Sequence, residues 1–356
     1  MFFFQASAGL ATGMHITSPL SRNLFSQAVI LSGSPFQTES LNTPENVQKF
    51  WSNYEKHQNC SEKQQKSDCL LKKVFQNRDS LISMKMVKTL SEDKLFVNIP
   101  VVVNGNFQPK KQTNLLDSIN NYNDNNQFSL LFGYTDDEGS WIASLEDKKT
   151  FNPKSKPNLT LSQGKVIIKN FTKKMKPIKN IMNSHQFEEH YLDNLLKKQP
   201  KAQDSEIVAR LVTEVLADHY IKCPLNIFGE KLSKKNANVF QYHWNYKGNQ
   251  KTSPFWSTFS KVWCGEWMGS CHSFEMFALF GQPFLTPENF DDEDRIVSKK
   301  FIQMISYFAH KNNLFWPKFD DSSKTFYVID SSLNEHKFGN NLKENECKNI
   351  WYDYIV

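Results

Sequence analysis

The sequence predicts an α/β fold in which helices cover both faces of a mainly parallel sheet. Short apolar segments typical of buried strands alternate along the chain with longer segments that have helical periodicity. The 356 residues, of which 39% are hydrophobic and 13% aromatic, are enough to bury a large core. We see no internal repeat, and we expect a single domain over residues 1–356.

Each expected element follows from a local pattern. Short apolar runs predict strands at residues 2–6, 28–31, 99–103, 129–132, 239–244 and 326–329. Helical spacing predicts helices at residues 8–18, 205–216, 293–311 and 346–354, and another that starts at Thr43-Pro44. Pro44 suits a first helical turn, because that turn needs no backbone N–H from it.

Three polar residues follow expected strands: Ser7, Glu138 and His272. The carboxyl ends of parallel strands carry the chemistry in folds of this class. A serine hydroxyl becomes a nucleophile only when a base takes its proton and an acid orients that base. Ser7 lies between a strand and a helix, in the segment Gln5 to Gly9, which is typical of a nucleophile elbow. The order Ser, Glu, His is that of the α/β-hydrolase triad.

Longer segments resemble the type B carboxylesterase and cholinesterase family. They are SPLSRNLF at residues 18–25, AVILSGS at 28–34, DDEGS at 136–140, EWMGSCHSFE at 266–275, and the segment from Asp218-His219 to Cys223-Pro224-Leu225. The resemblance runs through nearly all of the chain in order. It implies an α/β-hydrolase fold and a secreted serine hydrolase of small carboxylic esters, which needs no cofactor and no metal.

The resemblance also implies supporting roles. Ala8 would supply an oxyanion-hole N–H, and Ser32 would hydrogen-bond near the triad acid. Phe96 and Trp141 fall where the family lines its substrate pockets with aromatic residues. Ordinary core packing explains these two aromatic side chains equally well.

The six cysteines suit an oxidising compartment. The resemblance implies disulfides Cys60–Cys69 and Cys223–Cys347, and we expect Cys264 and Cys271 to pair in the loop before His272, with two buried thiols as the alternative. Asn59, Asn158 and Asn170 begin Asn-x-Ser/Thr sequons and are candidate glycosylation sites.

The beginning of the chain departs from the family pattern. The family has further strands and a glycine-containing oxyanion loop before the nucleophile, so we expect this chain to be an N-terminally truncated piece that lacks those strands. Gln5 stands where Ser7 as nucleophile would require glycine. The spacing to Ser18 also differs by one residue and fits Ala6 better at the nucleophile position. We place the nucleophile at Ser7 and keep Ala6 as the alternative.

A catalytically inactive adhesion or binding protein on the same fold is the second hypothesis, favoured by the altered elbow. Other classes are disfavoured. No apolar run is long enough to span a bilayer, residues 1–4 do not form a signal peptide, and no nucleic-acid motif accompanies the basic run at residues 165–179. His185 and His190 are five residues apart, so they diverge on a helix and do not share a metal ion. The oligomeric state is left open.

Overall fold

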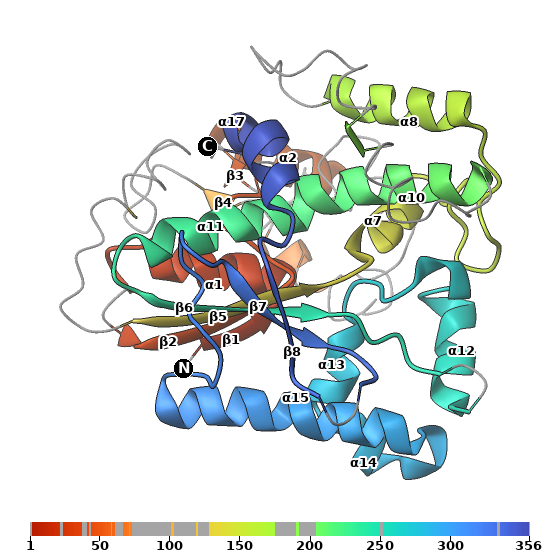
Figure 1. Ribbon diagram of the computed structural model, residues 1–356. Coiled ribbons are helices and arrows are strands. Elements are labelled where there is room, and N and C mark those ends of the chain that lie inside the picture. Colours follow the sequence, from red (N-terminus) through yellow and green to blue (C-terminus); the bar gives the residue numbers. More distant parts are fainter. Residues whose placement is uncertain are drawn as a thin grey trace.

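The computed structural model describes residues 2–21, 24–37, 41–42, 44–57, 59–60, 67–70, 72, 101–102, 119, 128–174, 190–191, 204–249, 252–332 and 335–355. Its centre is a six-stranded sheet in the order β1-β2-β5-β6-β7-β8 (Figure 1). The strands are β1 (Phe2–Gln5), β2 (Gln27–Leu31), β5 (Ser129–Thr135), β6 (Asn238–Trp244), β7 (Thr325–Ile329) and β8 (Lys337–Asn340). Neighbouring strands are parallel from β1 to β7, and β8 pairs antiparallel with β7.

The helices pack on both faces of this sheet, as the sequence predicts (Figure 1). One side carries α1 (Ser7–Thr17), α10 (Asp204–Ala217), α11 (Cys223–Ser233) and α17 (Tyr352–Ile355). The other side carries α15 (Asp292–Lys311) with α13 (Phe274–Leu279) and α14 (Gln282–Leu285). The remaining longer helices are α2 (Pro44–His57), α7 (Glu138–Glu146), α8 (Leu161–Lys174) and α12 (Pro254–Val262). A separate two-stranded sheet joins β3 (Leu41–Asn42) to β4 (Val101–Val102).

Successive side chains of the buried strands point alternately to the two faces of the sheet, and they pack into two separate hydrophobic cores. In β2, Ala28 and Ile30 join the cluster that contains Leu10 of α1, whereas Val29 and Leu31 join the cluster that contains Phe301 of α15. Successive side chains of a strand point to opposite faces, so a strand covered on both sides needs apolar residues at every position. This explains why residues 28–31 of β2 form one continuous apolar run.

The α/β class and the parallel sheet with helices on both faces are confirmed. The strands expected at residues 28–31, 129–132, 239–244 and 326–329 each lie within an observed strand that is longer by one to three residues. The expected C-terminal helix is broken: a π-helical turn, Cys347–Trp351, separates two short α-helical pieces. Of the strand expected at 99–103, only Val101–Val102 lies among the described residues. The sequence pattern does not predict strand β8, because its side chains are mostly exposed and it has no apolar run.

Candidate active site

The carboxyl ends of four adjacent strands position the candidate site. The chain leaves β1 at Gln5, β2 at Leu31 and β5 at Thr135, and directly after these points come the elbow, Ser32 and the 136–138 turn. The fourth strand, β6, ends at Trp244 and leads through a longer loop to His272. Parallel pairing places these ends at one edge of the sheet, so residues more than 100 positions apart in sequence meet there.

Glu138 and His272 form a buried acid–base pair. His272 Nδ1 lies 2.6 Å from Glu138 Oε2, and the two residues are 3% and 0% exposed. Burial raises the pKa of Glu138, but the contacts with His272, with Ser32 and with the Thr135 N–H outweigh it and hold that pKa below its usual value. Burial likewise lowers the pKa of His272, and the Glu138 carboxylate outweighs this and raises it. The ionised Glu138 therefore accepts the Nδ1–H and leaves Nε2 as the basic nitrogen.

A second buried carboxyl group, Glu275, shares Ser32 with Glu138. The Ser32 hydroxyl lies 2.5 Å from Glu138 Oε1 and 3.2 Å from Glu275 Oε1. Burial, followed by the charge of Glu138, raises the pKa of Glu275 to about 7. A serine hydroxyl has one proton, which the shorter contact assigns to Glu138. The contact with Glu275 is then a hydrogen bond only when Glu275 is protonated and donates.

The strained residue between β1 and α1 is Ala6. Its backbone angles are φ 53° and ψ −122°, and its N–H donates to Leu31 O at 2.8 Å. A non-glycine residue rarely adopts a positive φ, and such strain is concentrated at functional turns. A Cβ built on Gly33 would lie 2.2 Å from Ala6 O, so the close approach of the next strand end requires a glycine there. Ser7 is the first residue of α1, and its side chain is exposed.

The second ring nitrogen of His272, Nε2, contacts Gln5. Gln5 Nε2 lies 3.1 Å from His272 Nε2 and 2.6 Å from the Ser273 hydroxyl. Among the described residues, the side chains in hydrogen-bond contact with the His272 ring are those of Glu138 and Gln5, and Ser7 is not one of them. The sequence marks Gln5 only as a departure from the family pattern, because nothing local indicates a contact across 267 residues.

Aromatic side chains cover the imidazole. The ring of Trp141 stacks on the ring of His272 with centroids 4.7 Å apart, and Trp263 lies beyond it at 5.8 Å from Trp141. Trp141, named from the sequence as a possible pocket residue, is thus in direct contact with the candidate base. Phe96, the other such residue, lies outside the described residues.

The loop that carries His272 is fixed at two points. The disulfide Cys264–Cys271 closes it, and Asp137 accepts from the Ser270 N–H at 2.9 Å while donating its own N–H to Ser270 O at 3.0 Å. The disulfides Cys60–Cys69 and Cys223–Cys347 are also present, so all three expected pairings are found.

The sequons begin at Asn59, Asn158 and Asn170, whose side chains are all exposed, as glycosylation would require. Among the described residues, no group of three or more His, Cys, Asp or Glu side chains is arranged so that it could hold a metal ion.

Among the residues that the structure describes, no helix is both long enough and apolar enough to cross a bilayer.

Comparison with known proteins agrees with the fold. A family model described as the carboxylesterase family matches residues 4–350. Acetylcholinesterase-1 of Trittame loki is 25% identical over 238 residues, which are 65% of this chain and 39% of that protein. Acetylcholinesterase of Leptinotarsa decemlineata is 23% identical over 368 residues, covering 99% of this chain and 53% of that protein. Acetylcholinesterase 1 of Caenorhabditis briggsae is 26% identical over 157 residues, which are 40% of this chain and 23% of that protein. The chain thus spans about half, or less, of the length of these curated relatives. Because the family model matches almost the whole chain and the sheet has the expected parallel order, this chain belongs to the carboxylesterase family and has its α/β-hydrolase fold.

Proposed function

We propose that this protein hydrolyses small carboxylic esters through an acyl-enzyme, with Glu138 and His272 as its acid–base pair. The observation that carries the proposal is the 2.6 Å contact between these two buried side chains. A buried carboxylate is costly unless a partner compensates it, and here the partner is a histidine whose other nitrogen is left basic. Family membership and the names of the relatives, which are acetylcholinesterases, point to the same reaction.

In the proposed reaction, Ser7 is the nucleophile. Its oxygen attacks the ester carbonyl while His272 Nε2 accepts the hydroxyl proton, and the imidazolium then protonates the departing alkoxide. Water attacks the acyl-enzyme with His272 again as base, which releases the acid and restores Ser7. The N–H groups in the first turn of α1 have no partners within the helix, so the Ala8 N–H is available to the carbonyl oxygen. The Gln5 amide must leave Nε2 when the hydroxyl approaches.

A second function, ligand binding without cleavage, is favoured by a specific observation. The strained elbow backbone is found at Ala6, and the Gln5 amide contacts the imidazole nitrogen that a nucleophile would need. With a methyl group at the elbow, the site would hold an ester-like ligand and leave it intact. Such a protein would be an inactive, esterase-like adhesion or binding protein.

Fluorophosphonate labelling, with mass mapping of the adduct, separates the two functions. The wild-type protein, Ser7→Ala and Ala6→Ser are compared, each checked for native near-ultraviolet circular dichroism. Labelling of the wild type that disappears in Ser7→Ala supports the hydrolase with Ser7 as nucleophile. An unlabelled wild type together with a labelled Ala6→Ser supports the binding protein, with Ala6 at the nucleophile position. Folded proteins that all remain unlabelled would rule out the hydrolase.

We further propose that the protein folds in an oxidising, extracellular or secretory compartment. The three disulfides support this, because such bonds are rare in reducing compartments.

A further inference from the structure

The turn that presents Glu138 is held by contacts from three directions. The Asp136 N–H donates to Trp244 O at 2.9 Å, at the end of β6, and the Asp137 N–H donates to Ser270 O at 3.0 Å. The third contact comes from a side chain: Lys222 Nζ donates to Asp136 O at 2.6 Å. The carbonyl of Asp136 is two residues from Glu138, so a shift of this peptide moves the start of α7 and the carboxyl group on it.

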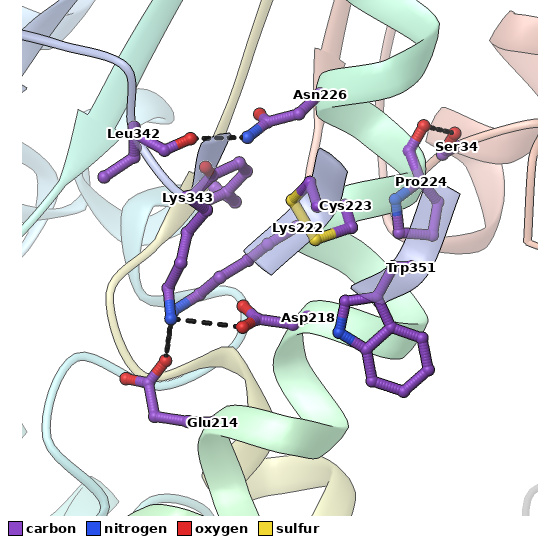
Figure 2. The surroundings of a disulfide bond; sticks show 12 residues. Ser34, Glu214, Asp218, Lys222, Cys223, Pro224, Asn226, Leu342, Lys343 and Trp351 are labelled. Carbon is purple, nitrogen blue, oxygen red and sulfur yellow. Dashed lines mark hydrogen bonds and ion pairs between the residues drawn. A yellow bond between two sulfur atoms is a disulfide. The ribbon is translucent and has the colours of Figure 1, made fainter. Parts of the chain in front are cut away.

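Lys222 is an unusual lysine. It lies in the π-helical turn Asp218–Lys222, immediately before Cys223, and its side chain is 2% exposed. Its Nζ lies 3.6 Å from the carboxylate oxygen Oε2 of Glu214. Glu214 also forms an ion pair with Lys343, whose Nζ lies 3.2 Å from Asp218 Oδ2. Figure 2 shows the side chains of the two lysines converging beside Glu214 and Asp218. Burial alone lowers the pKa of Lys222, but Glu214 and the other nearby carboxylates outweigh it and raise that pKa, so the side chain is charged at neutral pH.

A buried ammonium group is costly, and this one makes its shortest contact with a backbone carbonyl. Glu214 could be satisfied by Lys343 alone, because the two are already hydrogen-bonded. The specific consequence of Lys222 is therefore the fixed position of the Asp136 peptide. The disulfide holds the helix that carries Lys222 to the C-terminal segment, which keeps this support in place.

We propose that Lys222 is a positioning residue for the Glu138–His272 pair: by binding the Asp136 carbonyl, it sets where the Glu138 carboxylate meets the imidazole. The effect on turnover rests on the proposed hydrolase function. The effect on the imidazole does not, and it can be measured in a protein without activity.

The test compares Glu214→Gln with the double variant Glu214→Gln/Lys222→Met. The first keeps the bond from Lys222 to Asp136 O. The second removes that bond and leaves the net charge of the buried cluster as it is in the wild type, because one acidic and one basic side chain are replaced together. Lys231→Met, in α11, is a control for loss of a lysine elsewhere in the same helical segment. Histidine-selective ¹⁵N NMR then reports the Nδ1–H resonance and the titration of His272, with His272→Gln used to assign the signals.

We expect Glu214→Gln and Lys231→Met to keep the wild-type imidazole signals. In the double variant the Nδ1–H resonance should move upfield and the pKa of His272 should fall, because the hydrogen bond to Glu138 is weakened. Loss of a nearby positive charge alone would raise the pKa of His272, so the sign separates positioning from a field effect. If the wild type is labelled by fluorophosphonate, the labelling rate of the double variant should fall about tenfold to a hundredfold, the scale expected when a catalytic group is misplaced.

Unchanged His272 signals in a folded double variant would overturn the proposal, and so would a raised pKa of His272. If the double variant does not fold, Lys222→Met alone is measured in its place with the same expected shifts of the His272 signals, because Lys343 still compensates Glu214. A wild type that takes no label refutes the hydrolase and leaves the NMR test of Lys222 intact.

Discussion

Replacing Glu275 by glutamine should make the protein more stable at alkaline pH and leave it nearly unchanged at acidic pH. Glu275 is 0% exposed, its Oε2 has no hydrogen-bond partner among the described residues, and its Oε1 faces the hydroxyl of Ser32. A glutamine there can donate its N–H to Ser32, as the protonated carboxyl group does, but carries no charge at any pH. The variant therefore mimics the protonated form.

The size of the effect follows from the pKa. The folded-state pKa of Glu275 is about 7, whereas the ordinary value is 4.5. A raised pKa means that the stability contributed by this group is fully present below pH 4.5 and is lost as the pH rises to about 7. Ionising Glu275 then costs the wild type about 3 kcal/mol at pH 8 and under about 1 kcal/mol at pH 5.

Urea unfolding at pH 5 and pH 8 measures this difference. We expect Glu275→Gln to exceed the wild type in free energy of unfolding by about 3 kcal/mol at pH 8, with a gap below about 1 kcal/mol at pH 5. Glu266→Gln, at an exposed glutamate, is the matched control and should change stability by less than about 0.5 kcal/mol at both pH values. Equal destabilisation of Glu275→Gln at both pH values would show that the pKa of Glu275 is not raised in the folded state, and would refute this reasoning.

Three further changes have expected outcomes. Glu138→Gln should slow fluorophosphonate labelling by about 10⁴-fold, because the imidazole loses the acceptor that fixes its tautomer; a wild-type rate would remove Glu138 from the mechanism. Gly33→Ala should lower the free energy of unfolding by at least about 1–3 kcal/mol, since its Cβ would lie 2.2 Å from Ala6 O; an unchanged melting temperature would contradict the close packing at the elbow. Cys223→Ala/Cys347→Ala removes a disulfide across 124 residues and should lower the free energy of unfolding, measured with denaturant, by about 4–5 kcal/mol. A decrease below about 1 kcal/mol would show that the unfolded chain gains little conformational freedom when this disulfide is absent.

Much of the fold and part of the site can be predicted from the sequence. Buried parallel strands read as continuous apolar runs, so the apolar pattern alone locates β2 and β5 to within a few residues. Glu138 and His272 each lie in a run of residues that resembles one family, and the fold brings their side chains together. Apolar runs and motifs lie within short stretches of consecutive residues, so they can be recognised in a single sequence.

The elbow and its surroundings depend on tertiary structure. The sequence leaves the nucleophile position open between Ser7 and Ala6, because a motif and a spacing disagree by one residue. The strained backbone is found at Ala6, since the pairing of β1 with β2 places that residue's N–H against Leu31 O and ends the strand there. A one-residue difference in strand register changes which side chain leaves the sheet edge, and short-range pattern does not fix that register.

The sequence by itself thus determined the α/β class and the family, and it singled out Glu138 and His272, whose side chains are in contact in the structure. It could do so because apolar runs and motifs are properties of consecutive residues. Tertiary structure alone decided that Gln5 contacts His272, that Ser32 lies between two carboxyl groups, and that Lys222 holds the Glu138 turn. Each of these contacts joins residues at least 86 positions apart. Their energies depend on burial and on the geometry of single hydrogen bonds, which exist only once the strands have paired and the helices have closed over them.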